Sequence, residues 1–386
     1  MTTSALDTRT STPEELEACI KHGEVLLEQG KLGESEQAYL HAIALGEQQG
    51  AQKQVAVAYR LLGELYGVRR QLDKALEHLR QAIRRNTALD NRLDLMKDYL
   101  CLMWWLPYEE TFREAENLFL RILSLSRENS PVEEVAACHA GLGQVYLNQK
   151  AFDLALKAFE LSLGAYRSVG NKVEAGNQCI GIGLTHWARK DRPMAIQWLE
   201  RAIDHFVEAD ARRRLDHPYG TLATIYQGED DEKALEYRQR CRDLLEELGA
   251  KIHLPVVYMG LSFSLKTLRR YGEAEKALYQ AMQHAEGMGL TYHTLEVHAR
   301  LADLYLTSEH AEWAEEELHA ALQGYVRLGE EINVARVYVD LGNLKAKTQA
   351  IREARNYYAQ AQLLFWKLGR ADFAREVGEM VDKLRV

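Results

Sequence analysis

The residues that could do metal or thiol chemistry are scattered along this sequence of 386 residues. Its thirteen histidines do not combine with cysteines at zinc-ligand spacing, and no CxxC pair occurs. We therefore expect core or surface histidines, reduced thiols at packing positions and no metal site. The five cysteines are Cys19, Cys101, Cys138, Cys179 and Cys241.

Motifs for catalysis are also missing from the sequence. No HExxH, GxSxG, GxxxxGK[ST] or GxGxxG string occurs. The carboxylate runs Glu229–Glu232 and Glu315–Glu317 are better interpreted as solvated turn and helix faces than as acid/base pairs. The sequence predicts a protein that is not an enzyme and has no cofactor.

Basic residues gather at two places, which suggests either an anion-binding patch or a balanced connector. The run Arg212–Arg214 precedes a second group at Arg238, Arg240 and Arg242. Acidic residues close by favour the balanced connector. Lys and Arg number 48 and Asp and Glu 57, a formal charge of −9, which argues against non-specific nucleic-acid binding. No nucleic-acid partner is expected.

Neither a secretory signal nor a membrane span is visible. The N-terminus lacks a basic segment followed by an apolar one. The longest apolar run, residues 100–106, is far shorter than the roughly 20 residues that cross a bilayer. With reduced cysteines, these features predict a cytoplasmic protein without membrane insertion.

A nine-fold internal repeat supplies the elements that must position any site. One residue per repeat, called the anchor, recurs every 40 residues except for one interval of 39. The anchors of repeats one to nine are Gly23, Gly63, Met103, Gly143, Gly183, Ala223, Ser262, Ala302 and Gly342.

Slots at fixed offsets from the anchor predict two helices per repeat. Offsets −4, −1, 0 and +3 form one helical stripe, and +12, +16 and +19 form a second. Small residues at the anchor and at +12 should let the two helices approach closely. Asp73 and Asp153 are predicted N-caps of second helices. Left-handed helix stops are predicted at Gly50, Gly170, Gly249, Gly289, Gly329 and Gly369.

These slots resemble the tetratricopeptide repeat, with its pattern of aromatic, x2, Leu-Gly, x2, Tyr, then Ala, x3, aromatic, x2, Ala. Tyr59, Gly63, Tyr66 and Ala75 carry it in repeat two, and the resemblance covers about residues 15 to 370. It implies an all-α fold, a right-handed α-solenoid superhelix of about nine helix pairs plus a C-terminal capping helix. We predict a disordered tail over 1–13, the nine-repeat solenoid over 14–370 and the capping helix over 371–386.

The resemblance also implies that the first helix of each pair lines a concave groove. Offsets −6, +1 and +5 lie opposite the packing stripe, and none of these twelve positions in repeats four to seven is Asp, Glu, Lys or Arg. Amides and aromatic rings there would suit an extended peptide. The alternative is that neighbouring repeats or the N-terminal tail bury them. The candidate binding residues are Trp104, Tyr108, Gln144, Asn148, Asn177, Trp187, His217, Thr224 and Phe263.

Two repeats break the pattern, as is expected at functional or hinge positions. Repeat three has Met103 as its anchor, adds Trp104 and Trp105, and stops its first helix at Pro107. Repeat six is one residue shorter and places Arg238 in an apolar slot. Tolerated drift is an equally open interpretation.

The sequence thus favours an interaction scaffold or adaptor that binds a partner peptide or helix in the groove. Two alternatives stay open. One is a peptide-sensing regulatory receptor similar to bacterial pheromone-binding proteins of this repeat type, whose longer 40-residue unit it shares. The other is a self-assembling homo-oligomer.

Overall fold

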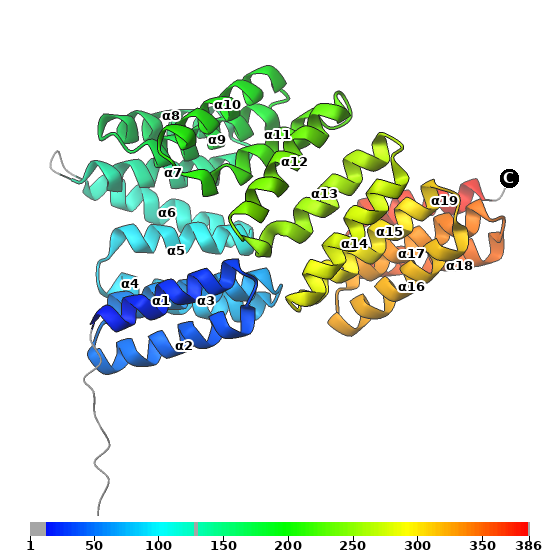
Figure 1. Cartoon of the computed structure of the whole chain (residues 1–386), viewed down its shortest axis with the longest axis horizontal. Coiled ribbons are helices and arrows are strands. Elements are labelled where there is room, and N and C mark those ends of the chain that lie inside the picture. The colour runs from blue at the N-terminus through cyan, green and yellow to red at the C-terminus, as the bar shows by residue number, and fades with distance from the viewer. Residues whose placement is uncertain (1–12, 127–129, 385–386) are drawn as a thin grey trace, which may run out of the picture. The chain divides into compact units, whose positions relative to one another are not determined.

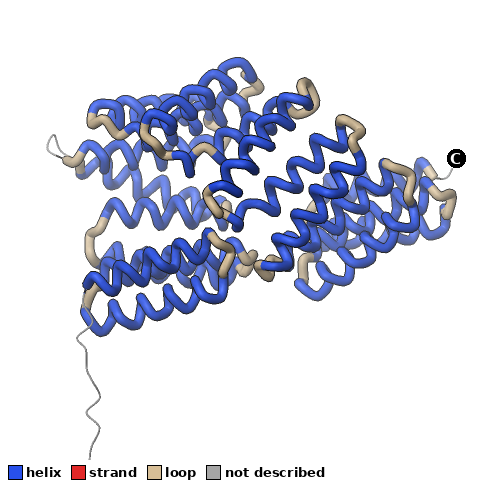
Figure 2. Tube along the Cα trace, in the orientation of Figure 1, coloured by secondary structure: helices blue, strands red, loops and turns tan. Residues whose placement is uncertain are grey.

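The computed structural model describes residues 13–126 and 130–384, and within these ranges the regular structure is entirely helical (Figures 1 and 2). The predicted tail over 1–13 lies outside the described residues, apart from Pro13 at the start of α1. The described chain forms nineteen α-helices, nine consecutive pairs and one more. The predicted all-α fold of paired helices is confirmed.

The first helices of the nine pairs are α1 (Pro13–Glu28), α3 (Gln52–Val68), α5 (Arg92–Trp105), α7 (Val132–Asn148), α9 (Lys172–Ala188), α11 (Asp216–Tyr226), α13 (Leu254–Thr267), α15 (Thr291–Thr307) and α17 (Glu331–Lys347). The second helices are α2 (Leu32–Gln49), α4 (Leu72–Ala88), α6 (Glu109–Leu125), α8 (Phe152–Ser168), α10 (Arg192–Glu208), α12 (Asp231–Glu247), α14 (Tyr271–Gly287), α16 (Ala311–Leu328) and α18 (Ile351–Lys367). The remaining elements are α19 (Ala371–Lys383) and the short 3-10 helices η1 (Arg212–Arg214) and η2 (Lys251–His253).

The chain divides into two compact units. Unit 1 comprises residues 1–226 and 243–252, and unit 2 comprises residues 227–242 and 253–386. The division falls in repeat six, whose first helix α11 has 11 residues where α9 has 17. One of the two irregular repeats of the sequence, repeat six, is therefore the one at which the two units separate. A single continuous solenoid over 14–370 stays a prediction.

Close packing of the two helices in a repeat explains the small anchor residues. A Cβ atom on Gly63 would lie 2.7 Å from the Leu79 side chain, and one on Gly143 would lie 2.7 Å from the Phe159 ring. Leu79 and Phe159 occupy offset +16 of their own repeats. The large side chain at +16 thus fills the space that glycine leaves, which any added methyl group would overpack.

The alanine slot at +12 is fully buried in each repeat. Where serine replaces alanine in repeat one, the Ser35 hydroxyl donates to the backbone oxygen of Gly23 at 2.8 Å. That bond satisfies a buried hydroxyl, so serine is tolerated in an apolar slot.

The ends of the helices confirm the predicted glycine stops and correct the predicted N-caps. All six glycines at the predicted stops have φ between 66° and 73°. Asp73 and Asp153 are not N-caps, because α4 and α8 each begin two residues earlier than expected. Both aspartates instead lie in the first turn, where a carboxylate still favours the helix dipole.

The final helix α19 covers the end of unit 2. Its buried residues, Ala374 and Val377, belong to the same apolar cluster as Phe365 of α18. Glu376, Glu379, Asp382 and Lys383 are exposed. The predicted solvated cap is confirmed.

Candidate functional site

The nine candidate residues fall in both units. Eight belong to unit 1, and Phe263 belongs to unit 2. Each keeps surface open to water: Gln144, Asn177 and Phe263 are half-buried, and the other six are exposed. In the described part of the chain, neighbouring repeats therefore do not seal these positions off. The other alternative, burial by the N-terminal tail, falls on residues 1–12, outside the described residues.

The irregular end of α5 separates two adjacent tryptophans. Trp104 is 70% exposed, whereas Trp105 packs over α3, where a Cβ on Gly67 would overlap its indole ring. The helix ends at Trp105, so Tyr108, 60% exposed, precedes α6 rather than continuing α5. Two large rings thus stand free in water at the turn of repeat three, a costly arrangement unless something covers them.

The amide residues of repeats four and five lie on the first helices α7 and α9, which pack against each other. Asn177 donates through Nδ2 to Glu174 at 3.1 Å, and Asn148 donates to the backbone oxygen of Gln144 at 2.8 Å. Both contacts are local to one helix. The amides are ordered by their own turns and keep acceptor oxygens for another group.

Phe263, the candidate in unit 2, lies between two cations. The Arg238 guanidinium carbon is 5.9 Å and Lys266 Nζ is 5.8 Å from its ring centroid. Arg238 donates to Gln227 Oε1 at 2.6 Å and to the Ser264 hydroxyl. Burial and the nearby Arg300 charge lower the pKa of Arg238 to about 10. The arginine in the apolar slot of repeat six is thus a partnered internal group.

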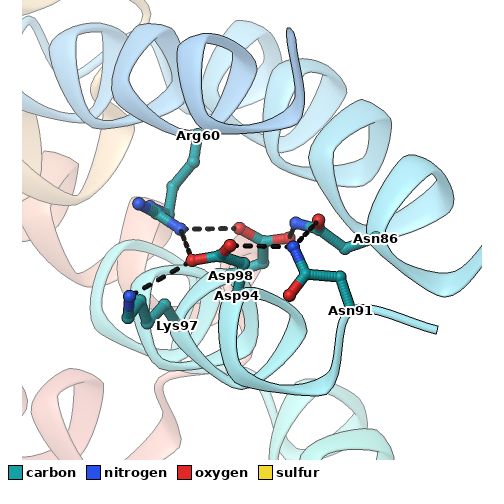
Figure 3. A network of polar contacts seen from close by, with 6 residues as sticks. All are labelled: Arg60, Asn86, Asn91, Asp94, Lys97 and Asp98. Carbon is teal, nitrogen blue, oxygen red and sulfur yellow. Dashed lines mark hydrogen bonds and ion pairs between the residues drawn. The ribbon is translucent and has the colours of Figure 1, made fainter. Parts of the chain in front are cut away.

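A buried polar network joins α3, α4 and α5 (Figure 3). Arg60 Nη1 lies 3.3 Å from Asp98 Oδ1 and 3.8 Å from Asp94 Oδ1. Asn86 donates to the second oxygen of Asp98 at 2.7 Å. Asp98 and Asn86 have no exposed surface. The repeat pattern of the sequence did not predict this network.

The rim of the network is held by two further residues that Figure 3 labels. Asn91, just before α5, donates to Asp94 at 2.8 Å and to Asn86 at 3.0 Å. Lys97 Nζ lies 3.2 Å from Asp94 Oδ1. Polar partners therefore surround both aspartates, as burial of charge requires.

Burial shifts the proton affinities of this part of unit 1. Desolvation raises the pKa of Asp98 to about 6, and Asn86 and Arg60 oppose the rise. Desolvation also raises the pKa of Glu64 against the pull of Arg60. Burial, and then the Glu64 charge, raise the pKa of the Cys101 thiol, so this cysteine is a poor nucleophile.

One signal in the sequence could have revealed Asp98. It stands at offset −5, where other repeats place Ala58, Cys138, Val297 and Val337, all buried. An aspartate in that column predicts a buried charge with a partner. Its partners could not be read from the sequence, because Arg60 and Asn86 come from two other helices.

The basic run Arg212–Arg214 forms η1, and carboxylates meet two of its side chains. Arg212 donates two bonds to Glu247, at 2.9 and 2.6 Å. Arg213 forms an ion pair with Glu28 at the end of α1. This agrees with the balanced connector, although the partners differ from the nearest acidic residues in the sequence.

Neither metal-binding nor membrane-crossing features are found where the structure describes the chain. No group of three or more His, Cys, Asp and Glu side chains there is placed to hold a metal ion. None of the described helices has the length and apolar character needed to cross a bilayer. The five cysteines are free thiols, three of them buried.

Comparisons with known proteins agree with this architecture. The family model described as tetratricopeptide repeat matches residues 16–88. No curated protein matches the sequence. One similar solved structure is a signal-transduction ATPase with numerous domains and a tetratricopeptide repeat sensor, from Pyrococcus horikoshii. It is 13% identical with a TM-score of 0.63, and the match covers 97% of this chain and 56% of that protein.

Two further solved structures also share the fold. The apo quorum sensor NprR from B. thuringiensis is 16% identical with a TM-score of 0.56, over 91% of this chain and 99% of that one. A Rap protein complexed with competence and sporulation factor is 13% identical with a TM-score of 0.50, over 96% and 98%. Residues 16–88 match the tetratricopeptide repeat family, and over the residues that the structure describes the chain has the fold of such repeats, nine helix pairs and a capping helix.

Proposed function

We propose that this chain is a non-enzymatic interaction protein that binds an extended segment of a partner protein on the first-helix face of unit 1. The observation that carries the proposal is the pair of exposed rings, Trp104 and Tyr108, beside an uncharged face. The accessible offsets −6, +1 and +5 of repeats four and five contain no Asp, Glu, Lys or Arg. An ordinary solvated helix face would carry several.

The physical gain from covering these rings is large enough to hold a partner. Each ring buries about 150–250 Å² when fully covered, and about 25 cal/mol is gained per Å². That is several kcal/mol per ring, before the cost of ordering the partner. Gln144 and Asn177 add acceptors and donors that match a peptide backbone, which favours an extended segment over a compact surface.

Two refinements of this function remain alternatives. NprR is a quorum sensor and the Rap protein was solved with competence and sporulation factor, so a regulatory receptor for a peptide is one. At 16% and 13% identity these likenesses show the fold alone. Self-assembly is the other. A light-scattering mass that stays at 44.1 kDa with rising concentration would exclude it. The cytoplasmic location and the lack of a nucleic-acid partner stay predictions from composition.

The decisive experiment selects ligands with the protein itself. A library of random peptides displayed on phage is selected on the full chain, and the enriched peptides are synthesised and titrated. Trp104→Ala should weaken them by at least about tenfold, since one ring's burial exceeds 1.4 kcal/mol. Trp366→Ala is the matched control, because Trp366 is 52% exposed on α18 of unit 2.

Three outcomes decide the proposal. Enriched peptides that lose affinity with Trp104→Ala and not with Trp366→Ala support it. Peptides that bind both variants as well as the native chain contradict the site. A selection that enriches nothing contradicts the function itself. Circular dichroism of each variant checks that the helix content is unchanged.

A further inference from the structure

Unit 2 contains a pocket that the repeat pattern did not predict and that the proposed function does not use. It has a volume of about 440 Å³ and lies between the start of α14 and the turn from α15 to α16. The side chains that line it include Tyr271, Tyr305, Trp313 and His310, together with Glu275 and Glu309. No lysine or arginine lines it among the described residues. The pocket is therefore aromatic and acidic.

The rings and one carboxylate are held in a fixed arrangement. Trp313 stacks on His310 with centroids 4.6 Å apart and meets Tyr305 edge-on at 5.4 Å. Half of the Trp313 surface is exposed. The Tyr305 hydroxyl donates to Glu275 Oε1 at 2.6 Å. Aromatic faces beside a carboxylate are the surroundings in which cations bind most favourably.

The same positions in repeats one and two show what this arrangement holds. Glu36 and Tyr66 stand at offsets +13 and +3, as Glu275 and Tyr305 do in repeats seven and eight. The Tyr66 hydroxyl also donates to its glutamate at 2.6 Å. There the site is filled by the chain's own cations. Lys74 Nζ lies 5.1 Å from the Tyr66 centroid, and Arg69 Nη1 is bound to Glu36 at 2.5 Å.

Repeat eight lacks both of these cations. Ser308 stands at offset +6, where repeat two has Arg69, and Trp313 stands at +11, where repeat two has Lys74. Arg270 on the adjoining turn is engaged elsewhere, with Nε and Nη2 each 2.7 Å from Glu273. The glutamate–tyrosine pair is thus retained in repeats seven and eight, while the cations that complete it in repeats one and two are replaced by an aromatic wall and an open pocket.

We infer that this pocket binds the positively charged side chain of an arginine or lysine supplied by a partner protein. The incoming group would lie over the Trp313 and Tyr305 rings and pair with Glu275, as Lys74 and Arg69 do with Tyr66 and Glu36. Because the pocket is open to solvent, the contact resembles one at the rim of an interface. The affinity of the pocket for a single side chain is therefore weak and depends on salt. This site goes beyond the proposed peptide face of unit 1 and does not rest on it.

The test uses the full chain labelled with 5-fluorotryptophan and followed by fluorine NMR. The sequence has six tryptophans, and the Trp313 resonance is assigned by its loss in Trp313→Phe. The probes are N-acetyl-arginine amide, N-acetyl-lysine amide and N-acetyl-citrulline amide at constant ionic strength. The two cationic probes should shift the Trp313 resonance in a saturable way. Neutral citrulline amide, which has nearly the shape of arginine, should not.

Two variants locate the binding. Glu275→Gln keeps an acceptor for the Tyr305 hydroxyl and removes the charge, so binding should weaken about tenfold. Ser308→Arg places a guanidinium beside Glu275, as in repeat two, and should abolish the response to both probes. Unchanged resonances of the other five tryptophans would show that the fold is intact.

The reciprocal variant is the matched gain-of-function control. Arg69→Ser combined with Lys74→Trp removes the internal cations from repeats one and two, and the new tryptophan resonance should respond to arginine amide. The inference is overturned if Trp313 does not respond to either cation, if citrulline amide shifts it equally, or if Glu275→Gln binds as the native chain does.

Discussion

Two neighbouring stretches of unit 1 differ in whether their polar side chains are buried or accessible. In repeats two and three, Arg60, Asp94 and Asp98 turn toward one another, and both aspartates are buried. In repeats four and five, Gln144 and Asn177 stay accessible on α7 and α9. In the first stretch the polar groups bond to one another and stabilise the fold. In the second they stay accessible to another molecule. Charge on a helix of this fold therefore does not by itself indicate a binding surface.

The largest effect on stability should come from truncating a side chain in the buried network of repeats two and three. Asp98→Ala would leave Asn86 Nδ2 without its acceptor and take one of two carboxylates from Arg60. We expect a loss of about 3 kcal/mol in the free energy of unfolding, typical of breaking a buried ion pair. Urea denaturation at pH 7 measures it. Asp98→Asn, which keeps the shape and one acceptor oxygen, should lose much less, and equal losses in both variants would contradict the network's role.

A smaller effect should appear as a dependence on pH. Burial raises the pKa of Asp98 from 3.8 to about 6. Between these values the folded chain binds more protons than the unfolded chain, so this contribution to stability grows as the pH falls from 7 toward 4. Its full size is on the order of 3 kcal/mol, of which about 1 kcal/mol appears between pH 7 and pH 5. Other titrating groups cancel when native and variant chains are compared.

The measurement is the change in unfolding free energy between pH 7 and pH 5. The native chain should gain stability relative to Asp98→Asn over this range. Asp340→Asn is the control, because burial likewise raises the pKa of Asp340 to about 6, but in unit 2. A pH response of Asp98→Asn equal to that of the native chain would show that Asp98 does not titrate in this window.

The smallest effect should come from the accessible side of the comparison. Asn148→Ala and Asn177→Ala each remove a contact local to one helix, so we expect changes within about 0.5 kcal/mol. Thermal melts monitored by circular dichroism measure this. A loss above about 1 kcal/mol would show that these amides are structural, and the contrast between the two stretches would not hold.

Most of the fold could be predicted because each repeat solves the same packing problem. Anchor glycines below the +16 side chains, buried alanines at +12 and glycine stops recur at fixed offsets. These are local constraints, so they can be read from a short stretch of sequence. The N-caps were misplaced by two residues, because no capping side chain marks the start of α4 or α8.

The polar sites were harder to predict, because their partners come from different helices. Asp98 could have been noticed as a charge in an apolar column, but its bonds to Arg60 and Asn86 depend on how α3, α4 and α5 pack. The nine candidate residues were found from helical phase alone. Phase tells which side of a helix a residue occupies, and not whether it shares a unit with the others, as Phe263 shows.

By itself the sequence determined the all-α repeat, its period and its closely packed pairs, since each of these follows from spacing within about 40 residues. Tertiary structure alone decided which groups are satisfied internally. It packed Trp105 against α3 and left Trp104 exposed one residue away. It also placed two cations against the glutamate–tyrosine pair of repeats one and two, and left a pocket beside the corresponding pair of repeats seven and eight. The reason is that a side chain's partner is fixed by the packing of separate helices, which no single helical pattern records.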